Sequence, residues 1–297
     1  MLSMHGGATA GGAPEVARVN GREAHGVSVL ERGLHYGDGL FETIACLGGR
    51  ARFLERHLER LGSGCARLGI TWRESSELAR EVHDLAAATT RAIVKVIVTR
   101  GRAVTRGYAP AAGEHATRIT LRYPWPEDDP LLTERGVRVR IASLRLGENP
   151  ALAGLKHCNR LEQVLARGEW SDPEISESLM FSSSGALVSA TTANVFLVRD
   201  ALLLTPRLDR CGVAGIMRAV VLAAAAGAGI AAEERVLDAQ DLAAAHEIFL
   251  TSALIGIRPV RELAGAPLGA GVVTRKLQAQ IAPLLAMRAV SAADTHG

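Results

Sequence analysis

The sequence predicts a mixed α/β (α+β) protein built of two domains. Stretches with apolar residues at helical spacing alternate with short apolar runs that are typical of strands. The length of 297 residues and an apolar content of 48% suit two ordinary domains with well-buried cores. The segment PWPEDDP over 124–130 contains three prolines and three acids, which interrupt helices and strands alike, so we expect the domain boundary there.

The first domain is expected over residues 15–126, after a flexible extension over 1–14 that is rich in glycine and alanine. Its elements are predicted from apolar residues spaced for helices and from short runs typical of strands. In order, they are hairpin strands over 16–21 and 42–54 with Gly48-Gly49 as the turn, helices over 53–69 and about 74–88, and strands over 92–101 and 116–125.

The second domain is expected over residues 131–297, and Lys156 lies just inside it. Its elements again alternate between strands and helices, with serine- and glycine-rich turns between the strands. In order, they are a strand over 136–146, a helix over 159–168, several strands over 176–206, a helix over 213–228, a strand and turn over 246–260, and a closing helix over about 271–287.

Composition excludes several classes of protein. The formal net charge is only +3, which argues against a nucleic-acid partner. The longest apolar run, over 219–232, is too short and too rich in glycine and alanine to span a membrane. Four scattered cysteines with no CxxC spacing, and no signal-like start, lead us to expect a cytoplasmic protein without a metal site.

Hydrolase motifs are absent from the sequence as well. It contains neither HExxH nor GxSxG, and the serines over 182–184 precede a glycine in a way that is typical of a hairpin turn. Four of the nine histidines, His57, His83, His115 and His246, are expected on polar faces. The sequence therefore gives no support to a metal hydrolase or a Ser/His/Asp enzyme.

Lys156 occupies an unusual position, between a strand-like stretch and a predicted helix. In one interpretation its ammonium group simply extends into solvent. In the other, partial burial and the positive end of the helix favour the free amine, which forms a Schiff base with a carbonyl group. The local sequence does not decide between the two.

Seven segments of the sequence, taken together, favour the second interpretation. They are RGLHYGDGLFET (32–43), HLERL (57–61), TRGRAVTRGY (99–108), LKHCNRLEQVLAR (155–167), TTANVF (191–196), GVAGIMR (212–218) and TSALIGIRPV (251–260). In this order they resemble the class IV, or fold type IV, family of pyridoxal-phosphate enzymes, and the resemblance extends over about residues 16–285. It implies a two-domain homodimer with pyridoxal 5'-phosphate in the interdomain cleft, bound covalently to Lys156.

The resemblance also implies which residues hold the cofactor. Its phosphate requires a fixed cation and backbone N–H donors. Arg60 matches the phosphate arginine of the family, although its place off the apolar stripe would by itself favour a solvated surface arginine. The other matching phosphate contacts are Ile216 and Met217 at a helix start, and Ser252 and Ala253 in TSALIG.

On the substrate side, the resemblance points to Arg106 and Tyr108 in the TRGY stretch and to Arg160 near the lysine. A forked guanidinium suits a substrate with two carboxylates. Arg160 has an alternative, since it is also spaced to pair with Glu162. The segment 32–43 is expected to shape the substrate side of the pocket, with its glycines as turn residues.

One position departs from the family pattern. Most members have a glutamate five residues before the asparagine of TTANVF, where it pairs with the ring nitrogen of the cofactor, whereas this sequence has Ser189. A carboxylate keeps the ring protonated and so strengthens it as an electron acceptor, which transamination needs more than elimination does. We interpret Ser189 as favouring a lyase. Its hydroxyl can hydrogen-bond a neutral ring nitrogen but cannot balance a positive charge on it.

The expected function is therefore the lyase activity found in this family, the elimination of pyruvate from 4-amino-4-deoxychorismate to give 4-aminobenzoate for folate synthesis. The first alternative is a branched-chain or D-amino-acid aminotransferase of the same family. The second is a non-enzymatic homologue that serves as an interaction module, against which the joint presence of Lys156 and Arg60 argues.

Overall fold

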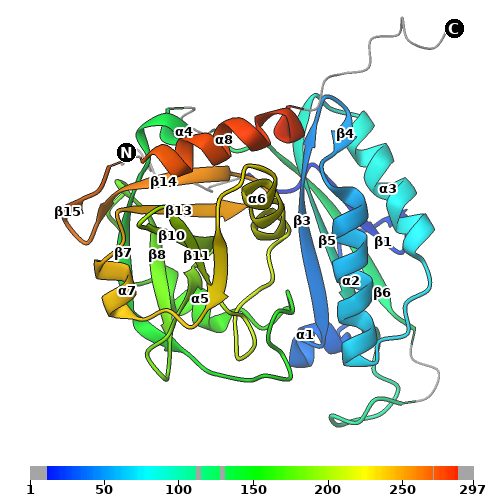
Figure 1. Cartoon of the computed structure of the whole chain (residues 1–297). Helices are drawn as coiled ribbons and strands as arrows, with labels where there is room; N and C mark the ends of the chain where they lie inside the picture. The colour runs from blue at the N-terminus through cyan, green and yellow to red at the C-terminus, as the bar shows by residue number, and fades with distance from the viewer. Residues whose placement is uncertain (1–11, 112–114, 128–130, 270, 287–297) are drawn as a thin grey trace, which may run out of the picture. The chain divides into compact units, whose positions relative to one another are not determined.

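The computed structural model describes residues 12–111, 115–127, 131–269 and 271–286 (Figure 1). Its contacts divide the chain into two compact units. Among the described residues, the N-terminal unit comprises 12–125, 156–159 and 283–286, and the C-terminal unit comprises 126–155 and 160–282. No helix within the described ranges is both long and apolar enough to cross a membrane.

The N-terminal unit is built on an antiparallel sheet with the strand order β2-β1-β6-β5-β3-β4 among its described residues. Helices α2 and α3 pack against this sheet (Figure 1). The elements are β1 (Val16–Val19), β2 (Arg22–Glu23), α1 (Arg32–Tyr36), β3 (Gly39–Leu47), β4 (Arg50–Ala51), α2 (Leu54–Leu68), α3 (Ser75–Ala87), β5 (Arg91–Thr99) and β6 (Thr117–Pro124).

Strand β5 shows why the sheet forms. Its residues alternate between the two faces, so Val94, Val96 and Val98 are buried while Ile93, Lys95 and Ile97 between them are half-buried. The buried valines belong to the face that α2 and α3 cover. The predicted strands and helices of this region and the Gly48-Gly49 turn are confirmed, whereas α1 was not predicted.

The C-terminal unit contains a mixed sheet in which the described strands follow the order β12-β11-β10-β13-β14-β7-β8-β9, with β15 beside β14. Neighbours are parallel at β11–β12, β14–β7 and β7–β8. The elements are α4 (Leu132–Arg135), β7 (Val137–Leu146), α5 (Leu161–Arg167), β8 (Ile175–Ser182), β9 (Leu187–Ala190), β10 (Asn194–Arg199), β11 (Leu202–Pro206), α6 (Ile216–Gly227), β12 (Ala232–Arg235), α7 (Ala239–Ala243), β13 (Glu247–Ser252), β14 (Gly256–Leu263), β15 (Ala266–Pro267) and α8 (Val272–Leu285).

The core of this unit centres on β10 and β13, which are buried over most of their lengths. Phe196 and Phe249 face each other across these strands, and their rings stack at a centroid distance of 4.9 Å. Helix α6 packs on β13. The strands and long helices expected here are confirmed, but the short elements α4, β12, α7 and β15 were not predicted. Strand β12, for example, is largely exposed and lacks an apolar pattern.

The division by contacts falls between Trp125 and Pro126, inside the segment expected to join the domains. It also groups Lys156–Asn159 with the N-terminal unit, whereas the sequence analysis placed Lys156 in the C-terminal domain. The reason is backbone pairing with β3, which local sequence patterns do not reveal. Most of the predicted N-terminal extension, residues 1–11, lies outside the described residues.

Candidate active site

The lysine segment is held by β3. The backbone N–H of Phe41 donates to the carbonyl of Lys156 at 2.9 Å, and that of Cys158 donates to the carbonyl of Gly39, also at 2.9 Å. Beyond this pairing, the Asn159 side chain donates to the carbonyl of Gly37 at 3.3 Å. Gly37 has a φ of 63°, and a Cβ there would lie 2.2 Å from Asn159 Oδ1, so only glycine fits.

The side chain of Lys156 is half-buried, and its amine lies over the ring of Phe41, with Nζ 4.2 Å from the ring centroid. Lys95 Nζ of β5 lies 5.4 Å from the same centroid. Because neighbouring residues of a strand point to opposite faces, Phe41 lies on the face opposite Glu42, which contacts α2. The amine of Lys156 therefore lies against an aromatic ring of the same unit, a contact that Lys95 also makes.

On the other face of the sheet, Glu42 binds two side chains of α2. Arg60 donates through Nε to Glu42 Oε1 at 2.8 Å and through Nη2 to Oε2 at 2.5 Å. His57 Nδ1 lies 2.6 Å from Glu42 Oε2. Glu42 is 2% exposed, and the Arg60 side chain is 18% exposed. Arg60 is thus a fixed cation, and the alternative of a solvated surface arginine is wrong.

The charge states of this cluster follow from its burial. Burial by itself raises the pKa of Glu42, but hydrogen bonds from His57 and Arg60 and the charge of Arg60 outweigh it, so the pKa lies below its ordinary value. Burial lowers the pKa of His57, and its hydrogen bond to Glu42 offsets only part of the effect. The contact between them is therefore a hydrogen bond from a neutral imidazole to a carboxylate.

His57 itself corrects the sequence analysis, which placed it on a polar face, because the structure leaves it only 1% exposed. A carboxylate buried on β3 requires donors, and the first turns of α2 supply them. His83, His115 and His246 are exposed, as predicted.

In the C-terminal unit, the start of α6 presents backbone N–H groups. The N-cap is Gly215, no side chain caps the helix, and Ile216 and Met217 form its first turn. Asn194 donates through Nδ2 to the carbonyl of Val213 at 2.9 Å and so fixes the chain that enters α6. A Cβ on Gly215 would lie 1.9 Å from Asn194 Oδ1. Glycine is therefore required for this close approach.

Ser252 and Ala253 lie at the end of β13 and in the turn that follows it. Asn194 pairs with Thr251 across β10 and β13, so the asparagine that holds the start of α6 is also next to Ser252 in the sheet. Thr251 fixes the turn by donating through Oγ1 to the carbonyl of Gly256 at 2.7 Å. Asn194 thus bonds to the chain that enters α6 and pairs with the strand that ends at Ser252.

Ser189 lies half-buried on β9, opposite Met180 of β8. The buried acid of the same hairpin is Glu177, whose carboxylate accepts hydrogen bonds from the backbone N–H and hydroxyl groups of Thr191 and Thr192. Burial raises the pKa of Glu177 above its ordinary value. Since these four donors bond to its oxygens, Glu177 stabilises the turn before Asn194.

The residues predicted to bind substrate are more open. Arg106 is exposed and Tyr108 is 84% exposed, both in the loop after β5. Arg160 precedes α5 in the C-terminal unit and donates through Nη2 to the carbonyl of Leu155 at 3.4 Å. Its proposed partner Glu162 accepts a hydrogen bond from the backbone N–H of Gly147 at 2.7 Å.

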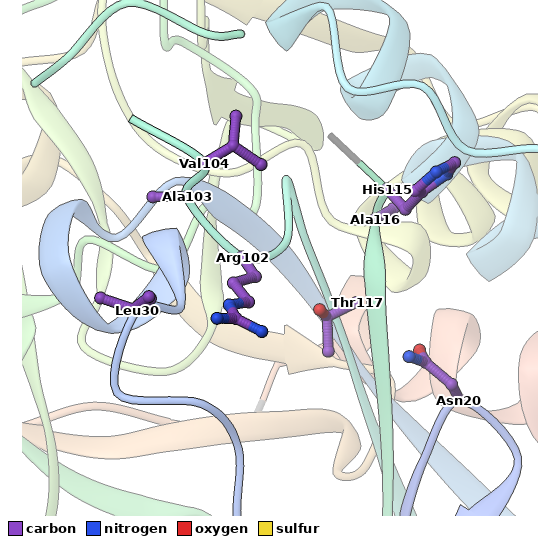
Figure 2. Close-up of a pocket in the computed structure, with 8 residues that line it drawn as sticks. All are labelled: Asn20, Leu30, Arg102, Ala103, Val104, His115, Ala116 and Thr117. Carbon is purple, nitrogen blue, oxygen red and sulfur yellow. The ribbon is translucent and has the colours of Figure 1, made fainter. Parts of the chain in front are cut away.

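A pocket of about 570 Å³ opens beside the same loop in the N-terminal unit (Figure 2). It includes none of the predicted site residues. Its lining residues are Asn20, Leu30, Arg102, Ala103, Val104, His115, Ala116 and Thr117. Within the described part of the chain, no group of three or more His, Cys, Asp or Glu side chains is arranged to hold a metal ion.

Sequence reasoning missed three residues that support the site: Glu42, His57 and Asn194. A signal was present for His57, because it lies three residues before Arg60 and so shares one face of the helix with it. Asn194 lies within a quoted motif but carries no sign of its contact with Val213, which is 19 positions away.

The sequence matches the amino-transferase class IV family over residues 39–263. It is 32% identical to an aminodeoxychorismate lyase of Vibrio harveyi, across 89% of this chain and 98% of that protein. It is also 32% identical to a putative branched-chain-amino-acid aminotransferase of Methanocaldococcus jannaschii, across 85% of this chain and 88% of that protein.

The fold gives the same result. The crystal structure of 4-amino-4-deoxychorismate lyase from Pseudomonas aeruginosa is 46% identical and superposes with a TM-score of 0.87, covering 90% of this chain and 98% of that chain. The two sheets and their helices are those of fold type IV, as the sequence predicted. This chain belongs to the class IV aminotransferase family.

Proposed function

We propose that this protein is a pyridoxal-phosphate-dependent lyase that eliminates pyruvate from 4-amino-4-deoxychorismate and yields 4-aminobenzoate. The observation that carries the proposal is the 46% identity with the Pseudomonas aeruginosa lyase over 90% of this chain. The arrangement of Lys156 supports it, because its half-buried amine is fixed over Phe41. The 4-aminobenzoate product is a folate precursor, which agrees with the expected cytoplasmic location.

The residues present fit the proposed cofactor. Gly215 leaves the start of α6 without a side-chain cap, so the N–H groups of Ile216 and Met217 suit a phosphate dianion. Ser252 and Ala253 are the other proposed phosphate contacts in the C-terminal unit. When bound, pyridoxal phosphate supplies an aldehyde for a covalent bond to an amine and a ring that accepts electrons.

Arg60 is a proposed phosphate contact in the N-terminal unit. Its guanidinium is oriented by two hydrogen bonds to Glu42, which fixes the direction of its remaining N–H groups. Because Glu42 is ionised, it also balances part of the arginine charge. We infer that orientation, more than net charge, is what Arg60 contributes.

Lys156 is the proposed catalytic residue. Its Nζ would hold the cofactor and, as a free amine, would remove the proton from the amine-bearing carbon of the substrate. The electron pair of that C–H bond would form the double bond that makes the substrate ring aromatic as the neighbouring C–O bond breaks. The enolpyruvate that leaves would take up a proton at its CH2 carbon, in place of the one removed by Lys156, and become pyruvate. Arg106, Tyr108 and Arg160 are the proposed partners of the substrate carboxylates and ring, and Ser189 is the proposed neighbour of the ring nitrogen of the cofactor.

A second candidate is a branched-chain or D-amino-acid aminotransferase. It is supported by the relative from Methanocaldococcus jannaschii, whose identity of 32% equals that of the Vibrio harveyi lyase. Ser189 argues against it, because a serine offers no carboxylate to the ring nitrogen of the cofactor. The buried acid of the same hairpin, Glu177, already accepts hydrogen bonds from Thr191 and Thr192. The lyase therefore remains the first proposal.

The deciding experiment supplies the purified protein with pyridoxal phosphate and 4-amino-4-deoxychorismate, and in parallel with leucine or D-alanine plus 2-oxoglutarate. We expect 4-aminobenzoate and pyruvate in equal amounts in the first reaction and little keto-acid exchange in the second. Exchange without 4-aminobenzoate would establish the aminotransferase and overturn the lyase. Light scattering of the eluting protein tests the proposed homodimer separately.

A further inference from the structure

The loop that carries Arg106 and Tyr108 is anchored by a buried arginine. Arg32, on α1, is 3% exposed. Its Nη1 donates to the carbonyl of Gly107 at 3.1 Å, and its Nη2 donates to the carbonyl of Tyr108 at 2.7 Å. The two carbonyls follow Arg106 directly in the sequence, so one guanidinium determines the backbone at the tip of the loop.

Aromatic contacts strengthen this anchor. The guanidinium carbon of Arg32 lies 5.0 Å from the ring centroid of Tyr36. The ring of Tyr36 in turn lies 5.2 Å from that of Tyr108. Arg32 and Tyr36 are the first and last residues of the short helix α1, so the helix contacts the loop through both its ends.

Arg32 is itself held in place. Its Nε donates to Asp38 Oδ2 at 2.9 Å, and the same carboxylate accepts from Arg100 Nε at 2.7 Å and from Arg100 Nη2 at 3.2 Å. Burial raises the pKa of Asp38, but hydrogen bonds from Arg100 and Arg32 and the charges of both arginines outweigh it, so the pKa lies below its ordinary value. Asp38 therefore stays ionised, and its carboxylate links Arg100, which precedes the loop, to Arg32.

The first part of the loop is fixed by the backbone. Arg32 N donates to the carbonyl of Gly101 at 2.9 Å, and Ala103 N donates to that of Leu30 at 2.8 Å. Figure 2 shows Leu30 close to Ala103 at the wall of the pocket. Both ends of the loop are thus attached to residues 30–32, while Arg106 between them is exposed.

We propose that Arg32 is a positioning residue that sets the conformation of the 101–108 loop and so places Arg106 and Tyr108 for the substrate. The proposal rests on the function proposed above, in which these two residues bind the substrate. Arg32 does not touch the substrate itself. A lysine at this position retains the charge beside Asp38 but lacks the planar fork that reaches two carbonyl groups.

The first test is limited proteolysis of the protein without cofactor or substrate. Trypsin cleaves after arginine, and Arg102 and Arg106 are exposed within the loop. We expect Arg32→Lys to be cleaved at these two sites about tenfold faster than the wild type. The matched control is Arg80→Lys on α3, whose side chain is 74% exposed and whose partner is Glu77 at the surface. An unchanged cleavage rate in Arg32→Lys overturns the proposal.

The second test is kinetic and uses the holoenzyme. Arg32→Lys is expected to raise KM for 4-amino-4-deoxychorismate about tenfold, with a smaller change in kcat and an unchanged affinity for pyridoxal phosphate. Equal losses in kcat and cofactor affinity would indicate general damage to the fold and contradict a positioning role. Should Arg32→Lys not fold, Tyr36→Leu removes the ring contact with Tyr108 and is expected to shift both readouts in the same direction.

The two tests separate this inference from the proposed function. If the wild type does not convert 4-amino-4-deoxychorismate, the proposed function fails, while the proteolysis still decides whether Arg32 holds the loop. If the wild type converts it and Arg32→Lys matches the wild type in both tests, only the role of Arg32 fails.

Discussion

In the proposed site, the two units would bind an anion by different means. The N-terminal unit uses side-chain charge, with the guanidinium of Arg60 oriented by the buried carboxylate of Glu42. The C-terminal unit uses the backbone, with uncapped N–H groups at the start of α6 and Gly215 packed against Asn194. The first arrangement depends on protonation and on the identity of side chains. The second depends on how closely the backbone approaches its neighbours, so it is sensitive to added volume and insensitive to pH.

The largest effect is expected at Lys156, which serves the proposed chemistry itself. Replacement by alanine should reduce formation of 4-aminobenzoate about 10³-fold, because the base and the covalent attachment are both lost. The chain contains three lysines, Lys95, Lys156 and Lys276, so borohydride reduction followed by peptide mapping tests the assignment directly. We expect the label on Lys156 and normal activity in Lys276→Ala. Label on another lysine would contradict the assignment.

The next largest effect tests the charged half of the comparison. Replacing Glu42 by alanine leaves Arg60 and the buried His57 without their shared acceptor, and we expect the free energy of unfolding to fall by about 3 kcal/mol. Urea denaturation measures this loss. Glu59→Ala, at an exposed position of α2, the helix that carries His57 and Arg60, serves as the control and should change stability by less than about 0.5 kcal/mol. A loss in Glu42→Ala no larger than in the control would show that the cluster is not stabilising.

The backbone half of the comparison is tested by two glycines of one helix. Gly215→Ala places a Cβ 1.9 Å from Asn194 Oδ1, so the start of α6 must shift, and affinity for pyridoxal phosphate should fall about tenfold. Gly227, the last residue of α6, has open space around its Cβ position, and Gly227→Ala should leave affinity unchanged. Absorbance titration with the cofactor compares the two variants. Similar affinities would remove the start of α6 from the proposed site.

A smaller effect is expected from pH, and it distinguishes the units further. His57 has a pKa lowered from its ordinary value of 6.5, so it contributes stability above that pH, and the contribution is lost as pH falls through its folded-state pKa. Glu42 has a pKa lowered from 4.5 and adds a second loss at more acidic pH. Urea midpoints between pH 8 and pH 4 should therefore decline on acidification.

The matched variants for this prediction are His57→Gln, which keeps a donor for Glu42 but does not titrate, and His83→Gln, at an exposed position of α3. The decline just below pH 6.5 should weaken in the first and persist in the second. If both variants follow the wild-type curve, His57 is not its source.

The smallest expected effect concerns Ser189. Replacement by glutamate restores the carboxylate of the family pattern and should raise transamination as a side reaction, because a protonated ring accepts electrons more readily. The ratio of keto acid to 4-aminobenzoate measures the change. A ratio equal to that of the wild type would refute the argument that Ser189 favours elimination.

The sequence by itself determined the elements with a clear period. Strand β5 alternates between buried and half-buried residues, and α2 carries apolar residues three or four positions apart, so both were predicted close to their observed bounds. Motif resemblance then pointed to Lys156, Arg60 and the start of α6 as candidate site residues. These signals are local, because the residues that define each one lie within about 20 positions of each other.

Only the tertiary structure decided how those pieces support one another. It buried His57 against Glu42, fixed Lys156 on β3 although it lies more than 100 residues away in sequence, and joined Arg32 to the carbonyls of Gly107 and Tyr108. Each of these contacts depends on a backbone pairing or on a buried polar group that finds a partner: the carboxylate of Glu42 accepts from His57, and the guanidinium of Arg32 donates to the two carbonyls. Such partners are selected by the cost of leaving a polar group unpaired in the core, and that cost exists only once the chain has folded.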